Sequence, residues 1–221
     1  MKMSKWLAGF ILSAMVCFPV YAQEAVQPAA APAALPSEQT VADMASLPEP
    51  MKYMKDKYAL AIELNKLAPS ADRDAKIKAF VDDMADYDDL AQRSLGERWD
   101  KLDAANQAEF KAVFREMIEL MYSKKIADKQ FNENKKIEWD RVVKTKTSAT
   151  VSCFTQQKDV ETELEIVLHP GIVSWKVYDV LVDGASLSNT YRKKYAKQLD
   201  EKGIDSILDD MKKEIESLKA K

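Results

Sequence analysis

The chain has 221 residues, 47% of them hydrophobic, and a formal net charge of -3. This length predicts one domain of ordinary size with tails, and the apolar fraction is enough for a sizeable core. A near-neutral charge gives no basis for a nucleic-acid partner, because nucleic-acid binding favours a basic surface.

Residues 1–22 have the pattern of a secretory signal peptide. A start that carries two lysines is followed by an apolar run too short for a comfortable membrane span. Small residues favour cleavage after Ala22. Cys17 lies in a poor context for lipidation, so the mature protein is predicted to begin at Gln23 without acylation.

Residues 23–48 are rich in Ala and Pro and predict a flexible leader, because Pro disfavours helix. The domain itself is predicted over residues 49–221. Once the signal peptide is removed, Cys153 is the single cysteine of the chain, which excludes an internal disulfide. Its place in an apolar strand predicts a small buried side chain and not a nucleophile.

Helical periodicity dominates the first half of the domain. Apolar residues predict helices over 51–67, 75–84 and 88–95, the last of them ended by Gly96. Asp103 then caps the longest helix, which has a wide apolar stripe. The stripe comprises Phe110, Val113, Phe114, Met117, Ile118 and Met121. Such a stripe is usually core, although flexible Met side chains also suit a ligand of variable shape.

Five aspartates between residues 82 and 89 invite a calcium hypothesis. A calcium loop of the EF-hand kind needs alternating oxygen ligands, a central Gly and a closing Glu, and this run lacks that pattern. Acidic residues at a turn and at the N-terminus of a helix explain the run more simply. No metal site is therefore predicted.

From Lys136 onward the apolar pattern has a period of two. Strands are predicted over 137–143, 147–155, 160–168 and 172–182. Their short connections are typical of an antiparallel meander. Two more helices follow, one capped by Ser186 and one over 204–218. The sequence thus predicts an α+β fold, in which a small four-stranded antiparallel sheet is covered by several helices.

The fourth strand is unusual because it is apolar on nearly both faces. It opens the stretch WKVYDVLVDGASLSNTYRKKY, which runs from Trp175 to Tyr195. One face of this strand can pack on protein. In so small a sheet, the other face of the strand also needs an apolar neighbour. This need is the main indication of function in the sequence.

Few residues have the pattern of a catalytic centre. His169 is the single histidine, and its predicted position at a turn before Pro170 is a poor one for a catalytic base. Asp179 is expected to have a structural role, pairing with Arg192 or with backbone donors. A chain with five glycines also offers little for a phosphate-binding loop. We therefore predict no catalytic residue, no cofactor and no enzymatic activity.

Two blocks of the sequence carry a family resemblance. The first block, DYDDLAQRSLGERWDKLDAANQAEFKAVFREMIELMY, contains Leu95, Gly96, Trp99, Phe110, Phe114 and Tyr122 at characteristic positions. The second block is the stretch from Trp175 to Tyr195, in which Ala185 stands where Val is usual. In this order and spacing the two blocks resemble the MlaC family, the periplasmic phospholipid-binding component of a bacterial ABC-type lipid transport system. The resemblance extends from about residue 51 to residue 218.

The resemblance implies an apolar cavity between the sheet and the helices, with a phospholipid's acyl chains inside and its head group at the mouth. It implies a periplasmic carrier that works in the maintenance of outer-membrane lipid asymmetry. Its partners would be an inner-membrane ABC transporter complex with its substrate-binding ring and an outer-membrane lipoprotein–porin complex. The candidate cavity residues are Phe114, Met117, Ile118, Met121, Leu164, Ile166, Leu168, Trp175 and Val177.

Two other functions stay open at this stage. One is an enzyme with an enclosed apolar pocket that acts on a lipid, and the other is a non-lipid interaction domain with a filled core. An enzyme depends on individual polar residues, whereas a carrier depends on its cavity and its docking surface.

Overall fold

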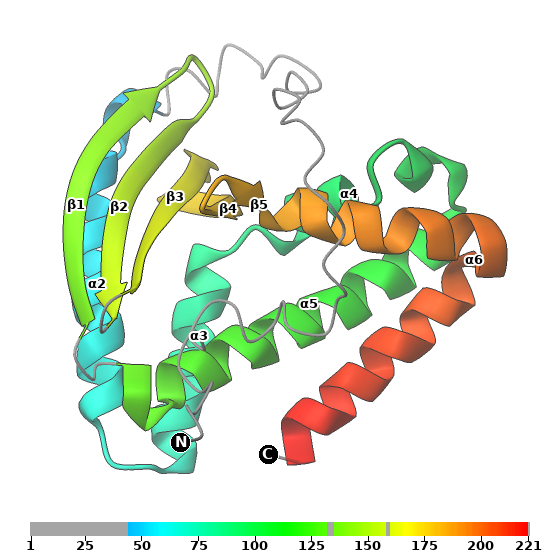
Figure 1. Cartoon of the computed structure of the whole chain (residues 1–221), viewed down its shortest axis with the longest axis horizontal. Coiled ribbons are helices and arrows are strands. Elements are labelled where there is room, and N and C mark those ends of the chain that lie inside the picture. Colours follow the sequence, from blue (N-terminus) through cyan, green and yellow to red (C-terminus); the bar gives the residue numbers. More distant parts are fainter. Residues whose placement is uncertain (1–43, 132–134, 158–159, 221) are drawn as a thin grey trace, which may run out of the picture.

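The computed structural model describes residues 44–131, 135–157 and 160–220 (Figure 1). The predicted signal peptide and most of the predicted leader lie outside these residues. The helices are α2 (Pro50–Lys66), α3 (Ala71–Met84), α4 (Tyr87–Leu95), α5 (Ala104–Ala127) and α6 (Leu187–Ala220), with short 3-10 helices η2 (Gly96–Lys101) and η3 (Lys129–Phe131). The strands are β1 (Lys135–Lys144), β2 (Ala149–Gln157), β3 (Val160–Pro170), β4 (Trp175–Val182) and β5 (Ala185–Ser186).

The helices begin and end where their capping residues place them. The Asp103 carboxylate accepts a hydrogen bond from the Asn106 backbone N at 2.8 Å, which confirms the predicted cap of α5. Gly96 has a φ of 57°, the positive value that ends α4 and that Gly adopts without strain. At the start of α6, the Ser186 hydroxyl accepts from the Asn189 backbone N at 3.1 Å, as predicted.

The sheet is an antiparallel meander in the order β1-β2-β3-β4-β5. It has five strands where four were predicted, because Ala185 and Ser186 turn back and pair with the end of β4. A bulge between Val167 and Leu168 leaves Tyr178 of β4 without an opposite residue, so that Tyr178 and Asp179 both enter the space beside the helices.

His169 was expected at a turn, and this expectation was wrong. The structure places it inside β3, paired with Lys176 of β4. The predicted strand ended at residue 168 because His169-Pro170 reads as a breaker. Pro170 is nevertheless the last residue of β3, where the sheet tolerates the loss of its backbone donor.

The buried side chains form two separate clusters. The helical cluster, centred on Phe110, Phe114, Ile118, Tyr195 and Ile207, joins the helices to one another. The sheet cluster consists of Tyr53, Met54, Ala149, Val151, Leu168 and Trp175, and it joins α2 to one end of the sheet. In Figure 1, α2 runs alongside β1 and β2, while α4, α5 and α6 form a layer of their own.

Both edges of the sheet are protected, including the part of β4 that the short strand β5 does not reach. The chain between α3 and α4 runs past β4, where the Asp86 backbone N donates to the Val177 carbonyl O at 2.8 Å. At the opposite edge, β1 presents the exposed charged residues Lys136, Glu138, Asp140, Arg141 and Lys144.

The last residues of the predicted leader contact the domain. Met44 and Leu47 pack against the sheet cluster. The Trp175 indole Nε1 donates a hydrogen bond to the Pro48 carbonyl O at 2.7 Å. The packed structure therefore includes residues from Met44 onward, a few positions before the predicted boundary at residue 49.

Candidate functional site

One face of the sheet is apolar across four strands. Strand register places Trp139, Cys153, Leu164 and Val182 in one row. The next rows contain Val142, Val151, Ile166 and Val180, and then Ala149, Leu168 and Val177. Because side chains alternate along a strand, all these residues point to the same side.

Helix α2 covers the Trp175 end of this apolar face and, through Tyr58, its β1 side at Trp139. Tyr53 and Met54 pack there in the sheet cluster, and the Tyr53 hydroxyl donates to the Trp175 carbonyl O at 2.8 Å. Beneath them Leu168 and Trp175 are almost completely buried. This end of the sheet is therefore ordinary filled core.

The other end of the same face keeps accessible apolar surface. Among the residues that the structure describes, Leu164, Val180 and Val182 belong to neither buried cluster, and all three are half-buried. Ile166 lies beside them at the margin of the sheet cluster and is also half-buried. We call these four residues, Leu164, Ile166, Val180 and Val182, the inner apolar surface.

The C-terminal end of α5 lies on the same side of the sheet as the inner apolar surface. The Asn65 side chain of α2 donates to the carbonyl oxygens of Ile126 at 2.6 Å and Asp128 at 2.8 Å. Tyr58 of α2 contacts Phe131 just after α5 and Trp139 on the apolar face, with ring centroids 6.5 and 6.2 Å apart. Since α2 lies on the apolar face, these contacts bring the end of α5 to that face.

The groups around this region are poorly hydrated. Burial raises the pKa of Tyr122 on α5 to about 12, with the charge of Asp179 adding to the effect, yet the Tyr122 side chain keeps accessible surface. Burial also raises the pKa of the Cys153 thiol, in the row of Leu164, to about 11. Cys153 is 1% exposed and Tyr122 is half-buried, so both groups are shielded from bulk water.

The nine predicted cavity residues divide into two groups. Five have almost no accessible surface: Phe114, Met117 and Ile118 in the helical cluster, and Leu168 and Trp175 in the sheet cluster. Four keep accessible surface, namely Met121, Leu164, Ile166 and Val177. The structure thus gathers the predicted sheet residues on one face. The α5 stripe packs mainly on α3, α4 and α6, so its middle does not oppose that face.

Sequence reasoning missed Val180, Val182 and Tyr58. Simple alternation along β4 places the two valines on the face opposite to Val177, and only the bulge at Tyr178 brings all three residues to one face. Tyr58 lies on the stripe predicted for the first helix, but helical periodicity does not say which neighbour a stripe packs against.

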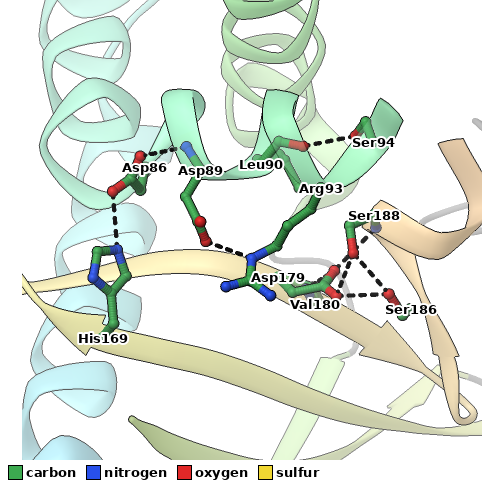
Figure 2. Close-up of polar contacts among 10 residues, drawn as sticks. All are labelled: Asp86, Asp89, Leu90, Arg93, Ser94, His169, Asp179, Val180, Ser186 and Ser188. Carbon is green, nitrogen blue, oxygen red and sulfur yellow. Dashed lines mark hydrogen bonds and ion pairs between the residues drawn. The ribbon is translucent and has the colours of Figure 1, made fainter. Parts of the chain in front are cut away.

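A polar network joins β3 to the start of α4 on the opposite side of the sheet (Figure 2). Nε2 of His169 lies 2.9 Å from Oδ2 of Asp86, and Arg93 donates to Asp89 at 2.6 Å. Burial raises the pKa of Asp86, but hydrogen bonds from His169 and from the Asp89 backbone outweigh it and hold the pKa below 3.8. His169 therefore has a side-chain partner, which the sequence did not indicate.

Asp179 forms a second polar cluster, between β4 and the start of α6, and has the structural role expected of it. Its carboxylate accepts hydrogen bonds from the backbone N of Val180 at 2.9 Å and of Ser188 at 3.1 Å. The hydroxyls of Ser186 and Ser188 donate to it at 2.6 and 2.8 Å. Of the two predicted partners, the backbone donors are the correct ones, because Arg192 donates to Asn189 instead.

The arrangement around His169 does not resemble a hydrolytic centre. In the part of the chain that the structure describes, Asp86 is the side chain that hydrogen-bonds to the His169 ring, and no hydroxyl or thiol does so. The neighbouring ring is Tyr178, 5.3 Å away in an edge-on contact. The described residues also contain no group of three or more His, Cys, Asp or Glu placed to hold a metal ion.

A surface hollow of about 520 Å³ lies at the α2-covered end of the sheet. It is lined by Met44, Ala45, Leu47, Pro48, Glu49, Pro50, Lys144, Thr145, Lys146 and Trp175. None of the four residues of the inner apolar surface lines it. Within the described ranges, no helix combines the length and the apolarity that a membrane span requires.

Comparisons with known proteins agree with this architecture. A family model described as MlaC protein matches residues 56–213 of the chain. A solved structure of a phospholipid-binding protein from Ralstonia solanacearum, in complex with a phospholipid, matches with a TM-score of 0.59 and 18% sequence identity. The match covers 82% of this chain and 99% of that one, and at this identity it shows a shared fold. A search of curated proteins found no match.

Proposed function

The chain belongs to the MlaC family, and from this membership and the inner apolar surface we propose that it is a phospholipid-binding carrier. The family match covers residues 56–213, which include every strand of the sheet. The phospholipid complex of the Ralstonia solanacearum protein supports the same ligand class for this fold.

The uncovered half of the apolar sheet face is the observation that carries the proposal. Leu164, Ile166, Val180 and Val182 form a continuous aliphatic surface that the helices leave accessible. Each methylene buried on such a surface contributes about 0.8 kcal/mol relative to water. A membrane offers an acyl chain nearly the same gain, so the exchange of lipid between membrane and protein stays close to balance. A site that takes up and releases lipid with little change in free energy suits a carrier better than a protein that retains its lipid.

The proposed setting is the periplasm, reached through the predicted signal peptide. There the protein would receive and deliver phospholipid at an inner-membrane ABC transporter complex and at an outer-membrane lipoprotein–porin complex. Family membership supports this assignment, and the resulting role would be the maintenance of outer-membrane lipid asymmetry.

Lipid extraction followed by mass spectrometry tests the proposal directly. The purified protein is expected to carry phospholipid in near-stoichiometric amount. Val180→Asp places a carboxylate in the middle of the inner apolar surface, where an unpaired charge is unfavourable beside acyl chains. This variant is expected to fold and to carry at least roughly tenfold less lipid, because loss of a few kcal/mol changes an equilibrium by that factor or more.

Val143→Asp is the matched control, since Val143 also lies in the sheet but is 51% exposed. It introduces the same charge away from the inner apolar surface and is expected to keep the full lipid load. If both variants fold and carry wild-type amounts of lipid, the inner apolar surface is not the binding site. If the wild-type protein carries no lipid and takes up none from vesicles, the carrier function is wrong.

A further inference from the structure

Lys125 occupies an apolar position of α5. It follows Ile118 by seven residues, Met121 by four and Tyr122 by three, so all four side chains lie on one face of the helix. Ile118 is 2% exposed, and Met121 and Tyr122 pack against the helical cluster. A lysine therefore continues the apolar stripe toward the end of α5 that is tied to α2.

The surroundings of the Lys125 ammonium contain an aromatic ring instead of a carboxylate. Its Nζ lies 5.0 Å from the centroid of the Tyr122 ring. Within the described residues it has no ion pair, whereas Lys111 on the same helix is 2.9 Å from Asp88 and Lys219 is 3.0 Å from Glu116. Lys125 is half-buried, and burial lowers its pKa.

A cation in such an environment is unfavourable unless something compensates its charge. A contact with an aromatic face offsets only part of the lost hydration. Proteins normally pair a shielded charge with an opposite one, or hold the group neutral. For Lys125 the protein supplies no carboxylate among the described residues, so the compensating anion has to come with a ligand.

The inner apolar surface indicates the kind of ligand that carries this anion. The end of α5 that carries Lys125 is on the same side of the sheet as that surface, because the Asn65 side chain donates to the carbonyl O of Ile126 and α2 packs on the apolar face. A small free anion would gain nothing from a neighbouring apolar wall. An amphiphile places its chains on the wall and its oxyanion at the margin.

We propose that Lys125 binds the phosphate of a phospholipid whose acyl chains lie on the inner apolar surface, an inference that rests on the proposed function. The ammonium donates hydrogen bonds to the phosphate oxygens, and the Tyr122 ring holds the lysine side chain in place. Such charge-assisted hydrogen bonds are strong where water is largely excluded. The site thereby distinguishes lipids that carry an oxyanion from neutral lipids with the same chains.

The test compares a lipid that carries a phosphate in its head group with one that carries none. Delipidated protein is titrated with phosphatidylglycerol and with a diacylglycerol of the same acyl chains, and binding is measured by native mass spectrometry. Lys125→Met removes the charge and keeps an apolar side chain of similar length. It is expected to weaken phosphatidylglycerol binding by roughly tenfold or more and to leave diacylglycerol binding unchanged within about twofold.

Two further variants serve as controls. Lys124→Met makes the same change on the adjacent residue, about 100° around the helix, and is expected to have no effect on either ligand. Lys125→Arg keeps the charge and is expected to retain most of the preference for phosphatidylglycerol. Circular dichroism and thermal unfolding establish that each variant is folded before it is titrated.

Each of the other results overturns the inference in a distinct way. If folded Lys125→Met binds both lipids equally more weakly than wild type, the Lys125 side chain packs beside the acyl chains and does not bind the phosphate. Unchanged phosphatidylglycerol binding would remove Lys125 from the site while the carrier function stands. If Lys125→Met weakens the binding of a fatty acid but not of phosphatidylglycerol, Lys125 binds a carboxylate and not a phosphate. If wild-type protein binds neither lipid, the proposed function fails as well.

Discussion

Asp179 in β4 accepts two hydrogen bonds from Ser188 in the first turn of α6, one from its backbone N at 3.1 Å and one from its hydroxyl at 2.8 Å. The carboxylate thereby joins the end of the sheet to the helix that follows it. Ser188 is 5% exposed, so water does not readily replace these bonds.

Asp179→Ala is expected to lower the free energy of unfolding by roughly 2–3 kcal/mol, because it removes a helix cap and leaves buried donors unpaired. Urea denaturation followed by circular dichroism measures this change. Asp209→Ala, at an exposed position of α6 after its break at Gly203, is the control and is expected to change stability by less than about 0.5 kcal/mol. A similar result for both variants would show that the Asp179–Ser188 contact does not stabilise the fold.

The Asp86–His169 pair predicts an acid-sensitive contribution to stability. Since the folded pKa of Asp86 lies below 3.8, its ionised form stabilises the fold above that pH, and this contribution is lost as the pH falls through the folded pKa. Asp86→Asn keeps a capping side chain for α4 but removes the charge. It is expected to be roughly 1–2 kcal/mol less stable than wild type at pH 7.

The difference between wild type and Asp86→Asn is expected to shrink as the pH falls below the ordinary pKa of a free Asp, about 3.9, and wild-type Asp86 takes up its proton. Urea midpoints measured over a pH range that spans this value give the comparison. A difference that stays constant over the whole range would contradict a charge-dependent role for Asp86.

His169→Ala separates the structural role of His169 from a catalytic one. The variant loses the contact with Asp86 and is expected to be destabilised by roughly 1–2 kcal/mol. Lipid load and lipid transfer between vesicles are expected to stay near wild-type levels, since His169 lies on the opposite side of the sheet from the inner apolar surface. A fall in transfer above roughly tenfold in the folded variant would favour the enzyme alternative.

Cys153 is expected to be unreactive in the folded protein. It is 1% exposed, and burial raises its pKa to about 11, so little thiolate is present at pH 8. Reaction with a thiol reagent at pH 8 is therefore expected to be at least about 100-fold slower in buffer than in denaturant. Labelling that is fast in buffer would show that the row of Leu164 and Cys153 opens to solvent.

Local signals in the sequence predicted most of the fold. The caps at Asp103 and Ser186, the break at Gly96 and the alternation of Leu164, Ile166 and Leu168 depend on neighbours within a few residues. Such signals do not show how distant elements pack. Hence the sequence did not indicate the pair of Asp86 and His169, which lie 83 residues apart.

The candidate site was predicted only in part, for the same reason. The stripe on α5 was visible, but Phe114, Met117 and Ile118 pack on other helices, and nothing in their spacing distinguishes a helix from a sheet as the neighbour. The signal for Lys125 was present, because a lysine interrupts the stripe at a position that continues it.

The contact of Asp86 with the edge of β4 has a consequence for how this protein behaves at high concentration. The Asp86 backbone N already donates a hydrogen bond to the Val177 carbonyl O. A strand from a second molecule therefore cannot pair with β4 at this position without breaking that bond. At β1 the exposed charges at Lys136, Glu138, Asp140 and Arg141 would have to be desolvated before another strand paired there. Both routes to edge-to-edge aggregation are thus unfavourable, which allows the sheet to keep an accessible apolar face without recruiting further copies of the chain.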